Sequence, residues 1–259
     1  MSKSVEVGDN HLLAMLSPDE DERVRGSLEL VEFSPGDSLC EPHLVMKCVY
    51  FPIDSIVSLL CVTENGGSAE IAAVGSEGIV GVSSFMGGDT SHSRAMVRSG
   101  GYGYRMPSWL LKDEFYRGGP MQRLLLRYTQ ALLTQMAQLA VCNRHHSVYQ
   151  QLCRLLLLSH DRLHNTELYM TQELIANTLG VRREGITEAA GKLQKAGLIE
   201  YYRGHITILD CAGLGARTCE CYHVVKREYE RLLPQRTADH AGIALPPPGP
   251  GRSVPVSAH

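Results

Sequence analysis

The sequence lacks an apolar run suited to crossing a membrane and an N-terminal apolar region suited to secretion. Its longest apolar stretch, residues 124–141, is interrupted by one arginine and three glutamines, whereas a spanning helix needs about 20 predominantly apolar residues. We therefore expect a cytoplasmic protein with no membrane partner. The phosphate-loop and dinucleotide-binding glycine motifs are also absent, and no Ser, His and Asp arrangement is readable. Glu77 has no evident partner for acid–base chemistry, so the sequence argues against an enzyme.

The cysteines form no pattern typical of a disulfide framework. The eight of them are scattered along the chain without a secretory signal, which favours reduced thiols: Cys40, Cys48, Cys61, Cys142, Cys153, Cys211, Cys219 and Cys221. Cys219, Cys221 and His223, with Cys211, are suitable metal ligands by type. On one helix, however, Cys219 and His223 share a face while Cys221 points away. We therefore favour buried free thiols over a metal site.

A second pair of candidate ligands, His160 and His164, lies one helical turn apart. Asp161 and Arg162 between them indicate a solvated helix face, which is the simpler interpretation. The sequence therefore predicts no metal site.

Charge is distributed unevenly along the 259 residues, a length that favours two domains. The net charge is −3, but residues 1–118 carry 9 Lys and Arg against 17 Asp and Glu, whereas residues 144–233 carry 12 against 10 and six histidines. An acidic front half and a mildly basic back half suit a molecule in which only the back half approaches phosphate.

The front half has the pattern of an antiparallel β-barrel or roll. Short helices are expected at 11–16 and 18–25, and strand-rich runs at 28–39, 49–62, 68–75, 79–86 and 93–106, separated by turns. Asn65-Gly66 is a strong hairpin signal. A helix at 107–117 should close the roll.

A long helix is expected over residues 120–143, about 35 Å in length. Six side chains recur at steps of three or four residues, close to the seam of a two-stranded coiled coil: Met121, Leu125, Tyr128, Leu132, Met136 and Leu139. We predict that they form a dimer interface, with Leu124, Leu133 and Ala140 facing the roll. The alternative is an ordinary helix buried against its own roll.

Residues 170–210 have the pattern of a helix-turn-helix followed by a β wing. Thr171 is a good N-cap, Gly180 suits a sharp turn with positive φ, and Ala176 and Ile186 suit a close helix crossing. The second helix, 183–196, buries Ile186 and an aliphatic stripe, and its other face is polar. The alternative is a helical subdomain with solvated charges.

A hairpin turning at Arg203-Gly204 would form the wing. The side chains predicted to contact bases or phosphates are Thr171, Gln172, Arg182, Arg183, Glu184, Thr187, Glu188, Lys192, Arg203 and His205. An amphipathic helix capped by Ser147 should precede this unit, and a last helix capped by Asp210 should follow it. The Pro-rich tail from residue 234 is expected to be disordered.

With these motifs the sequence resembles the Crp/Fnr family of bacterial transcription regulators over residues 10–232. The resemblance rests on FSPGDSL, on VGSEGIVG followed by SRAMVRS, and on TQELIANTLGVRREGITEAAGKLQKAGLI. It implies an α+β fold: a jelly-roll-like sensor β-roll (1–118), a dimerisation helix (119–143), a winged helix-turn-helix (144–233) and a tail (234–259). It also implies a homodimer on a palindromic DNA operator, with RNA polymerase as a further candidate partner.

The resemblance implies that Arg183 and Glu184 read bases. Where family members that read the best-known half-sites have an arginine, this chain has Glu188, so a different half-site is expected. Gly185 and Gly191 inside the recognition helix indicate close packing or mobility.

In the sensor half, cyclic-nucleotide binders of the family present Gly-Glu and Arg-Ser or Arg-Thr pairs. Here the corresponding pairs are reversed, as Glu77-Gly78 and Ser93-Arg94, and a one-residue shift in a strand turns Arg94 to the opposite face. Three alternatives remain open for this half of the chain: it binds a cyclic nucleotide, it binds another effector, or it binds no ligand.

Two cofactors of the family are disfavoured. An iron–sulfur sensor would need an N-terminal cysteine cluster, and no cysteine precedes Cys40. Haem binding through His43 or His92 is disfavoured because a lone histidine in a turn is usually solvated.

The main hypothesis is a DNA-binding regulator. In it, an event in the roll shifts the long helix, and a hinge at 143–146 changes the orientation of the recognition helix. The alternative is a small-molecule-binding module that acts through protein contacts.

Overall fold

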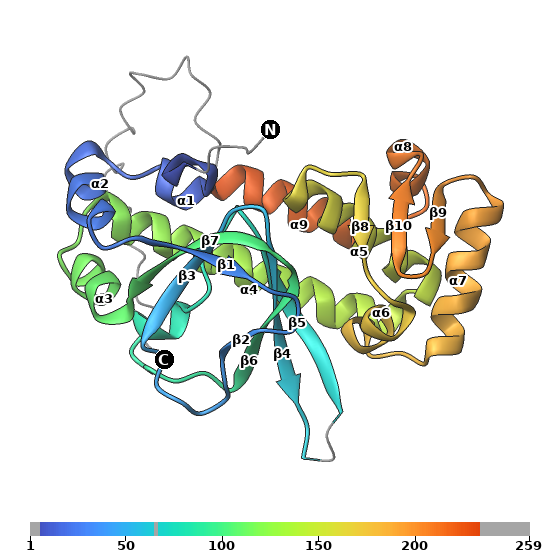
Figure 1. The fold of residues 1–259 in the computed structure, drawn as a ribbon, viewed down its shortest axis with the longest axis horizontal. Coiled ribbons are helices and arrows are strands. Elements are labelled where there is room, and N and C mark those ends of the chain that lie inside the picture. Colours follow the sequence, from blue (N-terminus) through green and yellow to red (C-terminus); the bar gives the residue numbers. More distant parts are fainter. Residues whose placement is uncertain (1–5, 65–66, 234–259) are drawn as a thin grey trace, which may run out of the picture.

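A computed structural model describes residues 6–64 and 67–233. Within them, a β-roll and a winged helical unit lie at opposite ends of one long helix, α4 (Figure 1). The expected Asn65-Gly66 turn and the expected disordered tail lie outside the described residues. No helix in the described part of the chain is both long and apolar enough to span a membrane.

The roll consists of two antiparallel sheets, as expected. The first has the order β1-β7-β3, with bounds Glu29–Phe33, Gly101–Pro107 and Cys48–Pro52. The second has the order β2-β6-β4-β5, with bounds Ser38–Cys40, Ser93–Ser99, Ile56–Val62 and Ser68–Val74. Apolar side chains from both sheets form one core, which includes Phe51, Val57, Val74 and Val97.

The strand expected at 79–86 does not form, so that prediction is wrong. Val80 makes a single bridge to Tyr50, and the chain then forms a short 3₁₀ helix, η2 (Val82–Ser84). Gly81 turns the backbone with φ 123°, a conformation that side chains with a Cβ rarely adopt. The hydroxyl of Ser84 donates back to the carbonyl of Gly81 at 2.7 Å. The alternation of apolar residues here therefore reflects a packed turn.

Short helices close the N-terminal end of the roll: η1 (Val7–Asp9), α1 (His11–Ala14), α2 (Pro18–Arg25) and α3 (Ser108–Tyr116). Asn10 caps α1, and its amide also donates to the carbonyls of Pro52 and Gly78. Glu20 accepts from the amide of Met121 at the start of α4, at 2.8 Å. These contacts fix α1 against the roll and α2 against the start of α4.

Helix α4 (Pro120–His145) lies along the roll with the predicted dimer seam turned inward. Of those six side chains, Met121, Leu125, Tyr128 and Leu132 belong to the core of the roll, Met136 packs against that core, and Leu139 is also buried. They are not free to meet a second copy, so the prediction that these six side chains form a dimer interface is wrong, and they are buried within the chain itself. Leu133 and Ala140, assigned to the roll, are exposed.

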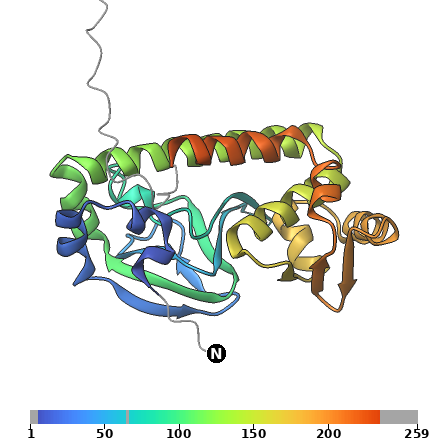
Figure 2. The same ribbon diagram turned by 90° about the horizontal axis from the view of Figure 1, so that it is seen from above.

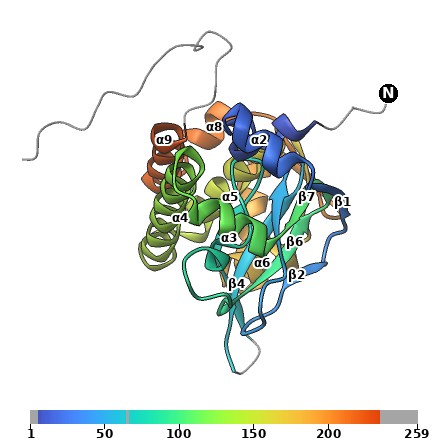
Figure 3. The ribbon, with the colours of Figure 1, turned by 90° about the vertical axis from the view of Figure 1, so that its left-hand side faces the viewer.

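The C-terminal segment contains two helices where one was expected. Asp210 caps only α8 (Cys211–Gly215), and α9 (Glu220–Leu232) begins after a break at residues 216–219. Helix α9 runs beside α4 in Figure 2, and the end-on view of Figure 3 has both helices on the same side of the strands. The rings of Tyr128 and Tyr229 meet edge to face at 6.4 Å between centroids.

Helix α5 (Val148–Leu163) carries the winged unit and joins it to the roll. Arg162 binds Glu77 at 2.7 Å and Gln135 at 2.6 Å. Its side chain is only 6% exposed, so the predicted solvated face at 160–164 is wrong at this residue. Beside it, the buried Arg98 binds Glu70 at 2.9 Å and Ser159 at 3.1 Å. Burial lowers the pKa of Arg98, and the charge of Glu70 opposes this effect.

Candidate nucleic-acid interface

Two short helices cross in the winged unit, and the first of them packs beside strand β5 of the roll. Helix α6 (Gln172–Leu179) is capped by Thr171, whose hydroxyl accepts from the amide of Leu174 at 3.2 Å. It ends at Gly180, which has φ 65°. Helix α7 (Arg183–Lys195) follows, and Ile186 fills the crossing with no exposed surface while Ala176 is 5% exposed. Each of these local features was predicted from the sequence and is confirmed.

The polar side of α7 faces away from this core. Arg182, Arg183, Glu184, Thr187, Glu188 and Lys192 are all exposed. Thr187 donates to the side chain of Gln172 at 2.8 Å, which links the two helices on their outer surface. Lys192 binds Glu188 at 2.7 Å, and this hydrogen bond lowers the pKa of the Glu188 carboxyl. Glu188 is therefore held ionised, as a group that only accepts hydrogen bonds.

The wing is a three-stranded sheet of order β8-β10-β9, with bounds Glu167–Tyr169, His205–Ile208 and Ile199–Tyr202. Its hairpin turns at Arg203 and Gly204, with φ 48° and 87°, as predicted. Arg203 lies over the ring of Tyr202 at 5.0 Å, and His205 packs on Tyr169. Strand β8 was not predicted, because three residues are too few for a periodic signal.

This arrangement places a helix end, an arginine pair and a hairpin tip on one side of the unit. Arg182 and Arg183 stand at the N-terminal end of α7, the end that enters the major groove in helix-turn-helix proteins. Arginine can donate two hydrogen bonds to guanine, and a carboxylate can accept from cytosine. Of the ten predicted contact residues, only Gln172 is half-buried; the other nine are exposed.

Comparison with protein families identifies the unit that holds these helices. Residues 150–217 match the family model of the Crp-like helix-turn-helix domain. This segment is a Crp-like helix-turn-helix domain. The match spans α5 to α8 and so includes both crossing helices and the wing. Among curated proteins, no sequence matches the chain.

Solved structures with a similar fold include transcriptional regulators of the Crp/Fnr family. A Crp/Fnr-family transcriptional regulator from Eubacterium rectale is 18% identical, with a TM-score of 0.62 over 79% of this chain and 96% of the other. A Crp/Fnr-family transcriptional regulator from Thermus thermophilus is 21% identical, with a TM-score of 0.56 over 73% and 97%. The c-di-GMP-responsive global regulator CLP from Xanthomonas campestris is 18% identical, with a TM-score of 0.54 over 73% and 97%. The chain therefore has the Crp/Fnr fold.

The four effector candidates do not meet in the roll of this Crp/Fnr-like chain. Glu77 is turned toward Arg162 on α5, and Gly78 lies against the ring of Tyr128. Arg94 is half-buried and pairs with Glu41 at 2.9 Å. Only Ser93 lines the cavity inside the roll. A cyclic phosphate in that cavity would therefore find no arginine among the lining residues.

The roll cavity has a volume of about 240 Å³ and is mainly apolar. Leu59, Ile71 and Val80 line it from the roll, and Met136 reaches it from α4. His92 stands on its edge, where its ring packs on that of His43 at 4.8 Å. A larger cavity of about 820 Å³ lies between the roll and the Crp-like domain, lined by Glu77, Arg162 and Tyr229 among others.

Proposed function

We propose that this protein is a transcription regulator that binds duplex DNA through its Crp-like domain. The observation that carries the proposal is the exposed polar side of α7, with Arg182 and Arg183 at its N-terminal end and the wing beside it. The apolar residues of α7 are buried in the domain core behind that side, and Arg182 and Arg183 are not part of that core. Glu188 in place of an arginine favours a half-site that differs from the best-known one.

The proposed regulator acts as a homodimer on a two-fold symmetric operator. Helix α4 carries an exposed row at steps of four and three residues, the spacing of a coiled-coil seam: Leu126, Gln130, Leu133, Ala137 and Ala140. Leu126 and Leu133, one heptad apart, are 50% and 53% exposed, so both leave apolar surface uncovered on α4. A second copy laid along this row would cover both leucines and leave the roll core undisturbed.

The proposed effector site is the apolar cavity of the roll. Because Met136 forms part of both its wall and α4, a ligand there would press directly on the helix that carries the proposed dimer seam. Its apolar lining and the pairing of Arg94 with Glu41 favour a ligand with little charge over a cyclic nucleotide. RNA polymerase is the expected downstream partner of such a regulator.

The test is direct binding to DNA. Duplexes selected from a random pool by the full chain would be titrated, with fluorescence anisotropy as the readout, against the wild type and Arg183→Ala. Loss of one arginine contact to a base should cost about 1–3 kcal/mol, a roughly 5- to 150-fold weaker affinity. Arg231→Ala, an exposed arginine on α9, is the matched control and should bind as the wild type does. Equal affinity of Arg183→Ala and the wild type would overturn the proposed role of α7.

A further inference from the structure

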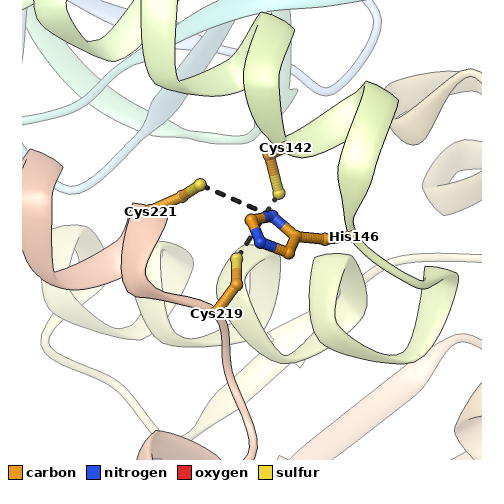
Figure 4. Close-up of side chains that lie close together, drawn as sticks. All are labelled: Cys142, His146, Cys219 and Cys221. Atoms are coloured by element: carbon orange, nitrogen blue, oxygen red, sulfur yellow. Dashed lines mark hydrogen bonds between the residues drawn. The ribbon is translucent and has the colours of Figure 1, made fainter.

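Three cysteines and one histidine meet where α4 ends and α9 begins. Cys142 is in the last turns of α4, His146 directly follows that helix, and Cys219 and Cys221 stand at the start of α9. Their Sγ atoms and a ring nitrogen of His146 all lie within 4.8 Å of one another (Figure 4). The three thiols are buried and unpaired by disulfides. Nothing in the proposed DNA-binding or effector function uses this cluster.

Local backbone geometry explains why the four side chains converge. Cys142 and His146 are four residues apart at the end of a helix, so both point from the same side. Cys219 is the N-cap of α9, with extended φ and ψ of −85° and 164°, while Cys221 is inside the first turn. The expectation that Cys221 points away from Cys219 is wrong because Cys219, as the N-cap, is not helical. The histidine of the cluster is His146, not the exposed His223.

We propose that Cys142, His146, Cys219 and Cys221 bind one Zn²⁺ ion. Tetrahedral zinc with Zn–S of about 2.3 Å and Zn–N of about 2.0–2.1 Å separates two sulfurs by about 3.8 Å and a sulfur and a nitrogen by about 3.6 Å. The Cys142 and Cys219 sulfurs are 3.5 Å apart, and the Cys221 sulfur is 3.6 Å from Nδ1 of His146. Three cysteines and a histidine form a common ligand set of structural zinc.

The surroundings of His146 suit this role. Its Nε2 lies 3.3 Å from a carboxylate oxygen of Glu220, so Nε2–H can donate there while the lone pair of Nδ1 points to the sulfurs. Histidines that bind metal almost always donate their other ring N–H in this way, which fixes the tautomer and ring orientation. The amide of Gln151 holds the same turn, because it donates to the carbonyl of His146 at 2.9 Å and to that of Cys142 at 3.4 Å.

A buried cation stands near the cluster. Zinc with three thiolates and a neutral histidine carries a net charge of −1, which is costly to bury without a counter-charge. Arg154 is 5% exposed, and its Nε has no hydrogen-bond partner among the described residues. It lies on α5 one helical turn after Gln151, whose amide donates to the carbonyl of Cys142. Arg154 would therefore offset part of the negative charge of such a centre.

The site would tie together three parts of the chain. It joins the end of α4 to the start of α9, and it fixes the turn from which α5 leads into the Crp-like domain. The joint at 143–146, where the sequence suggested a hinge, would thus be held by the metal. An iron–sulfur cluster fits less well, because its several irons and sulfides lie between the thiolates and hold them further apart.

The first experiment measures metal in the full chain. Wild-type protein, purified without an added histidine tag and under reducing conditions, should contain one zinc per chain by mass spectrometry. Replacing the zinc with Co²⁺ should give the visible absorption of tetrahedral cobalt thiolate, which requires no variant that could misfold. A folded wild-type chain that binds neither Zn²⁺ nor Co²⁺ would overturn the proposal, as would bound iron with acid-labile sulfide.

Variants then test the ligands. Cys219→Ser and Cys221→Ser should each lower the zinc content at least tenfold, and Glu220→Gln should weaken zinc affinity about 10- to 100-fold as an outer-sphere change. Cys153→Ser is the matched control, since Cys153 is equally buried but lies outside the cluster. It should keep one zinc per chain. Full zinc content in both Cys219→Ser and Cys221→Ser would contradict the assignment.

Discussion

At the scale of single residues, Glu20 links the N-terminal helices to the long helix. One carboxylate oxygen accepts from the amide and hydroxyl of Ser17, and the other accepts from the amide of Met121, 101 residues away in sequence. Burial acts to raise the pKa of Glu20, but these hydrogen bonds outweigh it and the pKa is lowered overall. The ionised form is therefore the one that stabilises the fold.

We predict that Glu20→Gln lowers the free energy of unfolding by about 1 kcal/mol at neutral pH, because an amide accepts fewer hydrogen bonds than a carboxylate. A group with a lowered pKa contributes stability above its ordinary pKa, and that stability is lost as the pH falls through the folded-state pKa. The difference between wild type and variant should therefore shrink below pH 4.5, the ordinary value for this carboxyl. Urea unfolding at neutral and acid pH measures it, and a difference that grows in acid would contradict this account.

Single residues also show which features of the structure could be predicted from the sequence alone. The cap at Thr171, the turn at Gly180 and the positive φ of Arg203 and Gly204 depend on neighbours within a few positions, so they were predictable. The meeting of Cys142 with Cys219, 77 positions later, depends on how α9 lies on α4. No local pattern encodes that approach.

At the scale of elements, α7 contains two glycines that its packing does not require. A Cβ built on Gly191 meets nothing within 4 Å, and one on Gly185 meets only Val148 at 3.8 Å, an ordinary contact. Of the two explanations expected for these glycines, close packing is therefore wrong, and mobility stays a prediction. Gly180 is different, because its φ of 65° disfavours any residue with a Cβ.

Gly191→Ala should raise the free energy of unfolding by about 1 kcal/mol, since alanine is the better helix former and has room here. Gly180→Ala should lower it by about 1–2 kcal/mol, the cost of left-handed backbone in a residue with a Cβ. Thermal unfolding of the two variants compares them within the same domain. A loss of stability in Gly191→Ala would mean that the glycine has a structural role that its surroundings do not indicate.

The orientation of α4 about its own axis shows why a helix can be predicted from the sequence while the surface it packs against cannot. The periodicity of its apolar residues was enough to predict the helix, but α4 has apolar residues on two sides. Met121 and Leu125 face the roll, and Leu126 and Leu133 face outward. Helical spacing cannot tell which side meets the roll, because both sides repeat at the same period.

Leu133→Lys should convert the proposed dimer into a monomer, because it places a charge in the centre of the seam. Light scattering should then give 28.5 kDa for the variant and twice that for the wild type. Leu209→Lys is the matched control, since Leu209 is 52% exposed and lies off α4, against 53% for Leu133. A variant that stays dimeric would rule out the row on α4 as the interface.

At the scale of the whole molecule, the roll and the Crp-like domain are joined by buried charges as well as by α4. Arg162 and Arg98 together contact the roll, α4 and α5 through Glu77, Glu70, Gln135 and Ser159. Removing one partner of a buried ion pair leaves the other uncompensated, so this contact resists partial opening. The sequence offered Glu77 only as an effector ligand, because its partner is 85 positions away.

The two proposed sites are placed to act on the same connection. The roll cavity touches α4 through Met136, and the proposed zinc site holds the end of α4 against α9 and α5. A movement of α4 caused by a ligand in the roll would thus be transmitted to the recognition helix through the turn at 143–146, which the proposed zinc site would hold. This arrangement is how a change in the roll could alter DNA affinity in the proposed regulator.

The central claim is that the Crp-like domain binds duplex DNA, and the salt dependence of affinity tests it most directly. We predict that the wild-type chain binds a selected duplex and that the logarithm of its affinity falls linearly with the logarithm of salt concentration, with a slope of about −0.9 for each phosphate neutralised. Binding that does not change with salt, or no binding to any duplex from a random pool, would contradict the account.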